Sequence, residues 1–149
     1  MTNHEAMNLA STCAQAMFKR DAASQAMGMR LLSAAPGCAR VGMNVRADMI
    51  QGHGTCHGGY LFALADSAFA FACNSYNEAT VAIGCSIDYI APAHLGDTLT
   101  ADCTEQSRSG RTGNYDVRIE NQQGQLIALF HGKSYKVRGA VLTQENPNE

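Results

Sequence analysis

The sequence predicts an α+β fold in which an antiparallel sheet wraps around one buried helix. The first observation is a segment from Tyr60 to Tyr76 that is apolar almost all round and contains neither glycine nor proline. A helix that is apolar on every side is usually buried on every side. The second observation is the chain after Glu78, where apolar and polar side chains alternate in runs separated by short turns. Such alternation is typical of half-buried antiparallel strands.

The composition indicates one globular domain. The chain has 149 residues, of which 46% are hydrophobic and 16% charged, and its formal net charge is -2. This balance lacks the basic excess typical of nucleic-acid-binding proteins, and no apolar run approaches the roughly 18 residues of a membrane span. The N-terminus has no secretory pattern. We therefore expect a cytoplasmic protein without nucleic-acid or membrane partners, whose six cysteines are reduced and mostly core residues.

The chain before the central helix contains a helical part and two strands. Alanines and methionines in residues 3–29 recur at helical spacing and predict one or two helices that end near Gly28. The pair Pro36-Gly37 predicts a turn between two strands, the second of which lies within residues 38–49.

The chain after the central helix reads as strands and turns. Strands are expected at residues 80–90, 97–108, 114–121 and 125–139, with the last interrupted by Gly132. We expect three parts in all: an N-terminal helical segment (1–28), a main domain (29–139) and a polar tail (140–149).

One carboxylate stands out in the central helix. Asp66 is the only charged residue between His57 and Glu78, and glycines cluster just before the helix, ending in Gly58 and Gly59. A lone carboxylate on a buried helix is costly unless it is paired or used. Asp66 is therefore either held by hydrogen bonds for structural reasons or serves as a general base or nucleophile.

Other chemistries have weaker signals. His53, Cys56 and His57 could begin a metal site, but the only further ligands are the distant His94 and His131, so we expect no metal. The nucleophile-elbow, dinucleotide-binding and P-loop patterns are absent from the sequence.

Two motifs resemble a known family. "CHGGYLFALADSAFAFACNS" (56–75) and "IDYIAPAHLGDTL" (87–99) are similar to the hotdog-fold acyl-CoA thioesterases, in particular the phenylacetic acid degradation thioesterase subfamily. The resemblance covers roughly residues 26–137. It implies a hotdog fold, hydrolysis of phenylacetyl-CoA or hydroxyphenylacetyl-CoA, and release of coenzyme A during phenylacetate breakdown. It also implies no cofactor and a homodimer as the minimal active unit, usually within a homotetramer.

The resemblance also implies roles for individual residues. The Gly58 amide at the helix N-terminus would donate to the oxyanion, and Asp66 would act as general base or nucleophile. His57 would order the loop or touch the thioester carbonyl. Ser67 would bond the carboxylate or a water, although a purely structural hydroxyl is an equal alternative.

Substrate-binding residues are expected in three places. Gly59 would let the substrate approach the backbone closely, and Gln51 stands where many relatives have asparagine. The turn "SRSGRTG" would contact coenzyme A. The alternative is a solvent-exposed hairpin turn with no role in substrate binding. Its candidates are Arg108, Ser109, Gly110, Arg111 and Thr112. Lys133 and Lys136 are weaker phosphate candidates.

The spacing of the two main residues predicts a dimer. Eight residues of helix span about 12 Å at ~1.5 Å per residue, so Asp66 hardly reaches a carbonyl held at Gly58 of its own helix. If both act on one carbonyl, the site is shared between two copies of the chain. Two alternatives remain: a hotdog dehydratase or hydratase using His57 with Asp66, and a non-catalytic acyl-CoA-binding module.

Overall fold

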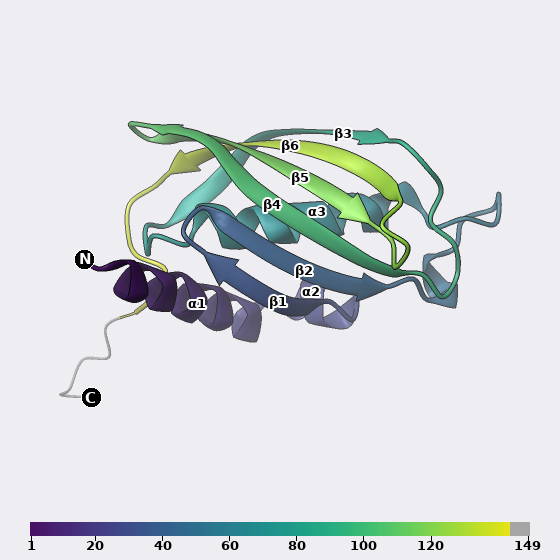
Figure 1. Ribbon diagram of the computed structural model, residues 1–149, viewed down its shortest axis with the longest axis horizontal. Helices are drawn as coiled ribbons and strands as arrows, with labels where there is room; N and C mark the ends of the chain where they lie inside the picture. Colours follow the sequence, from purple (N-terminus) through teal and green to yellow (C-terminus); the bar gives the residue numbers. More distant parts are fainter. Residues whose placement is uncertain (144–149) are drawn as a thin grey trace.

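The computed structural model describes residues 1–143, and one six-stranded antiparallel sheet curves around a central helix (Figure 1). The helices are α1 (Asn3–Arg20), α2 (Ala22–Ala26), the 3₁₀ turn η1 (Ala47–Met49) and α3 (Gly58–Cys73). The strands are β1 (Arg30–Ala35), β2 (Cys38–Asn44), β3 (Thr80–Tyr89), β4 (Thr98–Ser109), β5 (Thr112–Glu120) and β6 (Leu126–Lys136). Most of the expected polar tail, residues 144–149, lies outside the described residues.

Helix α3 forms the centre of the core, as its all-round apolar sequence predicts. Leu64, Ala68 and Phe69 are almost completely buried between the sheet and the N-terminal helices. The Phe69 ring packs against the rings of Tyr115 on β5 and Phe130 on β6, with centroids 5.4 and 6.0 Å apart. The edge-to-face contact of Phe69 with Tyr115 adds to the stabilisation from burial. The prediction of a sheet wrapped around a buried helix is therefore confirmed.

The alternating strands present one face to α3 and the other to solvent. On β5, Tyr115, Val117 and Ile119 are buried, whereas Asp116 and Arg118 are exposed. The period of two in the sequence thus determines which side chains contribute to the core.

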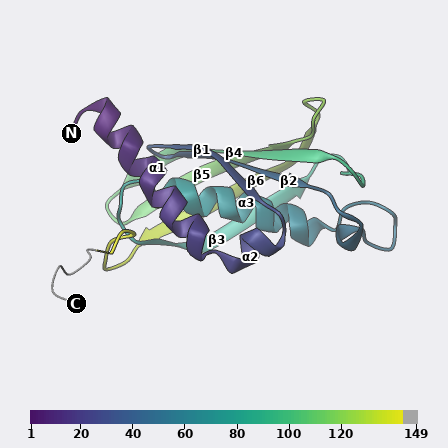
Figure 2. The ribbon, with the colours of Figure 1, turned by 90° about the horizontal axis from the view of Figure 1, so that it is seen from below.

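The N-terminal helices pack beside the sheet edge formed by β1. Helix α1 begins with a capping box, in which the Thr2 and Glu5 side chains each accept from the other's backbone N–H. Figure 2 shows α1 lying obliquely to α3, and the Phe18 and Phe71 rings join the two helices at 6.2 Å. The expected one or two helices before Gly28 are two helices.

The strand order differs from a simple meander. The order in the sheet is β1-β2-β4-β5-β6-β3, so β3 lies at the far edge and β2 pairs with β4. Strands that are consecutive in the sequence are neighbours only within the pair β1–β2 and within the run β4–β5–β6. Alternation specifies which face of a strand is buried but is the same for every neighbour, and the order therefore could not be read from the pattern.

The cysteines are all free thiols, and Cys13, Cys56, Cys73 and Cys103 are buried. Burial raises the pKa of the Cys73 thiol to about 12, so this group stays protonated and behaves as a small apolar side chain. None of the helices within residues 1–143 is both long and apolar enough to cross a membrane.

Candidate active site

The N-terminus of α3 presents one unused backbone donor. His57 is the N-cap, and its Nδ1 accepts a hydrogen bond of 2.9 Å from the Gly59 N–H. The Gly58 N–H has no acceptor among residues 1–143. The first amides of a helix have no intrahelical partner and lie at the positive end of the helix dipole. Of the two candidate glycines, therefore, Gly58 keeps its amide available and Gly59 does not.

A groove of about 530 Å³ opens beside this donor. Gln51, His57 and Gly58 line one part of it, and apolar side chains of the segment after β3 line the rest. Its lining residues are Gln51, Thr55, Cys56, His57, Gly58, Leu61, Tyr89, Ile90, Ala91, Pro92 and Ala93. An apolar groove with a few polar groups suits a ligand that is largely apolar.

The tip of the Tyr89 side chain lies against Gly58. A Cβ atom at Gly58 would lie 2.8 Å from Tyr89 Cζ, so a side chain there would displace the exposed Tyr89 ring. The Tyr89 hydroxyl also donates to the Gly58 carbonyl over 3.1 Å. Tyr89 was not predicted as a site residue. No sequence pattern near the end of β3 indicates that it lies beside the N-terminus of α3, 31 residues earlier.

Gln51 uses its amide within its own loop. Its Nε2 donates to Thr55 Oγ1 over 2.7 Å, and its Oε1 accepts from the His53 N–H over 2.6 Å. The side chain therefore holds the loop of residues 51–55 closed at the rim of the groove.

Asp66 is a half-buried carboxyl without a hydrogen-bond partner among the described residues. Burial, and secondarily the charge of Asp21, raise the pKa of its carboxyl above the usual range. The Asp66 charge in turn contributes to raising the pKa of the Cys85 thiol on β3, so the carboxylate lies toward that strand. An unpartnered carboxyl of raised pKa on a buried helix is consistent with Asp66 acting as a general base or nucleophile.

Asp66 does not line the groove beside Gly58 of the same chain. The two residues are separated by eight positions of continuous helix, which is about 12 Å at ~1.5 Å per residue. One chain therefore holds the donor and the carboxylate apart, at two places along α3.

Ser67 points to a different neighbour. Its Oγ lies 2.8 Å from Ser24 Oγ, which donates to Asp21 Oδ2 over 2.6 Å. Ser67 thus ties α2 to α3. This contact fits the structural alternative for its hydroxyl rather than a bond to the Asp66 carboxylate. This contact also holds α2, with its N-cap Asp21, beside α3. The Asp21 charge is thereby close enough to help raise the pKa of Asp66.

The candidate coenzyme A turn is a tight hairpin between β4 and β5. Gly110 has a positive φ of 60°, and Ser109 pairs with Thr112 across the two-residue turn. The Thr112 hydroxyl donates to the Ser109 carbonyl, and Arg111 donates to the Lys136 carbonyl.

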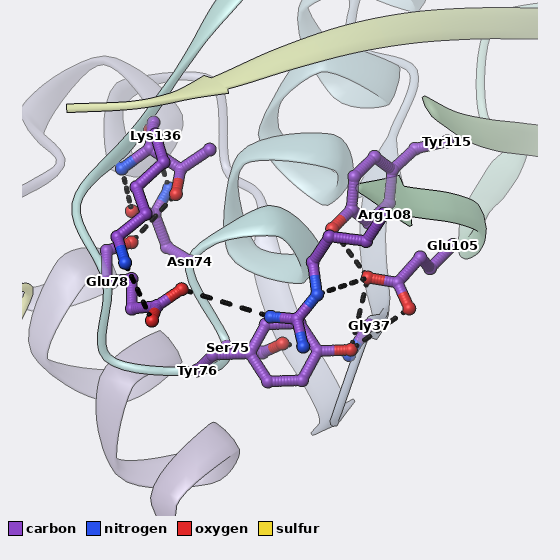
Figure 3. A network of polar contacts seen from close by, with 10 residues as sticks. Gly37, Asn74, Ser75, Tyr76, Glu78, Glu105, Arg108, Tyr115 and Lys136 are labelled. Atoms are coloured by element: carbon purple, nitrogen blue, oxygen red, sulfur yellow. Dashed lines mark hydrogen bonds and ion pairs between the residues drawn. The ribbon is translucent and has the colours of Figure 1, made fainter. Parts of the chain in front are cut away.

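Arg108 belongs to a charged network at the C-terminal end of α3 (Figure 3). Its guanidinium lies 3.5 Å above the centre of the Tyr76 ring and forms ion pairs with Glu105 and Glu78. The side chain is fixed in the region where the sequence analysis expected phosphate contacts, but acidic groups of the same chain already occupy it.

The histidines and the cysteine that were considered as metal ligands do not converge with further ligands in the described part of the chain. Within residues 1–143, no three His, Cys, Asp or Glu side chains converge to hold a metal ion. Cys56 is buried and its thiol pKa is raised by burial, which disfavours the thiolate that metals bind.

The arrangement suits the hydrolysis of an activated acyl group. An amide at a helix N-terminus stabilises negative charge on a carbonyl oxygen, and a carboxylate of raised pKa can attack that carbon or activate water. An antiparallel sheet wrapped around a central helix is the hotdog fold, and the chemistry available at this helix is that of a thioesterase.

Sequence comparison agrees with this class. The profile of the thioesterase superfamily matches residues 53–128, which include the α3 N-terminus, Asp66 and β3 to β5. The chain belongs to the thioesterase superfamily and is a thioester hydrolase.

Within the superfamily the chain is similar to bacterial PaaI proteins. It is 48% identical to the acyl-coenzyme A thioesterase PaaI of Escherichia coli (strain K12), over 86% of this chain and 91% of the relative. The structure of the E. coli PaaI protein from the phenylacetic acid degradation operon has a TM-score of 0.89 and 46% identity, covering 90% of this chain and 97% of that chain. The resemblance found in the sequence is thereby confirmed.

A more distant solved structure was determined with a bound ligand. A protein of Streptococcus mutans UA159, bound to acetyl CoA, has a TM-score of 0.72 and 27% identity, covering 75% of this chain and 90% of that chain.

Proposed function

We propose that the protein hydrolyses arylacetyl-CoA thioesters such as phenylacetyl-CoA or hydroxyphenylacetyl-CoA. The free amide of Gly58 would bind the thioester oxygen, and Asp66 would act as general base or nucleophile. The observation that carries the proposal is the pair itself: an unused helix N-terminal donor beside an apolar groove, and an unpartnered carboxyl of raised pKa on the same helix. The similarity to PaaI supports the choice of acyl group.

Either route converts the thioester and water into a carboxylic acid and a thiol. As a base, Asp66 takes a proton while the water oxygen bonds to the acyl carbon, and the proton passes to the sulfur when the C–S bond breaks. As a nucleophile, its oxygen bonds to the acyl carbon, the sulfur leaves as a thiolate, and water then cleaves the mixed anhydride. In both routes negative charge develops on the oxygen that the Gly58 amide would bind.

The active unit we propose is a homodimer joined through β3. This strand forms one edge of the sheet, and its side chains Val81, Ile83 and Tyr89 are exposed. A long apolar edge is normally covered by another strand.

The backbone of β3 is suitably oriented for this pairing. The Ile90 N–H donates inward to the Ile127 carbonyl over 2.9 Å. Backbone groups alternate between the two edges of an antiparallel strand, so those of Ile87 and Tyr89 point to the free edge. A two-fold axis at β3 would join the two sheets and set the α3 helices antiparallel. That arrangement would bring Asp66 of one subunit to Gly58 of the partner subunit. By resemblance, two dimers would form a homotetramer, which sedimentation analysis would detect.

A panel of acyl-CoA thioesters tests the activity through release of the free thiol. Phenylacetyl-type thioesters are expected to turn over fastest, and Asp66→Asn is expected to lower kcat by about 10²–10⁴-fold. Binding without thiol release would support an acyl-CoA-binding module instead, and hydration of an enoyl-CoA would support the hydratase alternative.

The folded state of Asp66→Asn provides the control. Because folding raises the pKa of the Asp66 carboxyl, its charged form costs stability as the pH rises through the folded pKa. The variant should therefore unfold at pH 7 at a temperature no lower than the wild type. An inactive variant that was also unfolded would leave the assignment of Asp66 without support.

A further inference from the structure

Tyr89 supplies the groove beside Gly58 with a phenol ring that the proposed reaction does not use. The side chain stands at the end of β3 and is 53% exposed. Its hydroxyl donates to the Gly58 carbonyl over 3.1 Å. Because Gly58 has no side chain, the tip of the ring lies close against the first turn of α3. The hydrogen bond thus holds one end of the ring, and its exposed surface remains available to a ligand.

The other apolar walls of the groove do not distinguish an aromatic from an aliphatic acyl group. Leu61, Ile90 and Pro92 present aliphatic surface, and burial against such surface depends on the apolar area of a ligand rather than on its shape. Aromatic rings also attract each other through their quadrupoles, with ring centres about 4.5–7 Å apart. Within residues 1–143, the groove lining contains one phenyl-type ring, that of Tyr89. We therefore expect any preference for aromatic acyl groups to come chiefly from this residue.

The Tyr89 ring also lies next to the place that we assign to the thioester carbonyl. The thioester oxygen would bind the Gly58 amide at about 2.9 Å. In an arylacetyl thioester a single methylene separates the carbonyl carbon from the aromatic ring, so that ring stays close to Gly58, against which the Tyr89 ring lies. A cavity of about 150 Å³ holds benzene, so a groove of about 530 Å³ has room for an arylacetyl group.

Pairing of two subunits through β3 keeps this ring in the shared site. The proposed pairing uses backbone groups at the free edge of the strand, whereas the Tyr89 side chain reaches Gly58 on α3. The ring and the Gly58 amide belong to one subunit, and Asp66 would come from the partner subunit. The residue that contacts the acyl group and the residue that activates water or attacks the carbonyl would thus stand on different chains.

We propose that Tyr89 determines the acyl specificity of the enzyme by packing its ring edge-to-face against the ring of an arylacetyl group. The inference rests on the proposed acyl-CoA substrate and on the Gly58 amide as the donor to its carbonyl. The ring gives a preference for aromatic over alkyl acyl groups of similar area. The hydroxyl only holds the ring in place through the Gly58 carbonyl.

The test compares Tyr89→Leu with Tyr89→Phe, using phenylacetyl-CoA and hexanoyl-CoA as substrates. The measured quantity is the ratio of kcat/KM for the phenylacetyl thioester to kcat/KM for the hexanoyl thioester. Tyr89→Leu should lower this ratio about two- to tenfold, which is the contribution of an aromatic pair beyond the burial of its area. Tyr89→Phe keeps the ring and should keep the ratio of the wild type.

The matched control is Tyr135→Leu. It removes a tyrosine of 39% exposure from β6, outside the groove lining, and should leave the ratio unchanged. Because the Tyr89 side chain is itself exposed, Tyr89→Leu should unfold at the same temperature as the control.

A binding measurement makes the test independent of turnover. The phenethyl and hexyl thioethers of coenzyme A have no carbonyl to hydrolyse, and calorimetry should show that Tyr89→Leu weakens binding of the phenethyl thioether more than that of the hexyl thioether. An unchanged preference in Tyr89→Leu, or an equal loss of preference in Tyr89→Leu and Tyr89→Phe, would overturn the inference. If the wild type releases thiol from neither thioester, the proposed function fails, while the thioether affinities still decide the role of Tyr89.

Discussion

Gly58 and Asp66 occupy one helix under opposite constraints. At Gly58 the Tyr89 ring lies where a Cβ atom would stand, and the Gly58 amide is left without an acceptor within residues 1–143. Asp66 must keep a carboxyl that burial disfavours. Native structures retain such costly groups where function requires them. These two residues were identifiable from the sequence, because a lone acid in an apolar helix and a glycine pair at its start are both local signals.

The environment of Asp66 predicts the acid limb of the pH profile. The proposed mechanism uses the ionised Asp66 carboxyl, and burial together with the Asp21 charge raises the pKa of this group. The acid limb of kcat/KM should therefore lie above the ordinary aspartate pKa of about 3.9. Asp21→Asn should move the limb to lower pH, since asparagine caps α2 equally well but carries no charge.

The matched control for this shift is Asp102→Asn. It removes the same charge from β4, where Asp102 pairs with Arg40, and should leave the limb where it is. A profile that responds equally to both substitutions, or to neither, would argue against Asp21 as the neighbour that tunes Asp66.

At the level of elements, most helices and strands could be predicted from the sequence, but the pairing of the strands in the sheet could not. The central helix and the strands after Glu78 follow local patterns of apolar residues, and the turn between β1 and β2 follows from Pro36-Gly37. The position of β3 beside β6 does not, because alternation carries no information about neighbours. For the same reason Tyr89 was missed, and the sequence left the role of the Ser67 hydroxyl open, whereas in the structure it bonds Ser24.

Gly132 gives a prediction at this scale. The sequence shows it only as an interruption of the last strand, whereas in the structure a Cβ atom there would lie 2.9 Å from the Phe69 ring. Gly132→Ala should therefore force α3 away from β6 and lower the free energy of unfolding by about 1–3 kcal/mol. Chemical denaturation measures this change.

The comparison variant for Gly132 is Gly52→Ala. A Cβ atom at Gly52 meets nothing within 4 Å, so its effect on unfolding should be small. If Gly132→Ala is as stable as Gly52→Ala, the close packing of β6 on α3 does not constrain the position of the helix.

The two edges of the sheet, β1 and β3, differ in what they expose. β1 lies beside α1, whereas β3 presents exposed apolar side chains and unpaired backbone groups along one edge. The separated halves of the candidate site, Gly58 and Asp66, both lie on α3, which packs across the inner face of the sheet and also contacts β3. A shared site at a β3–β3 interface would explain both features at once, and the sequence alone indicated it only through the spacing of the two residues.

The most direct test of the shared site is complementation between two inactive variants. Asp66→Asn lacks the carboxylate, and Gly58→Val places a side chain against Tyr89 and blocks the donor. A heterodimer of the two, isolated through different affinity tags, contains one site with both the intact Gly58 and the intact Asp66. It should recover about half the wild-type activity per dimer, since two-fold symmetry gives each dimer two sites. A heterodimer as inactive as its folded parents would contradict a site built from both subunits.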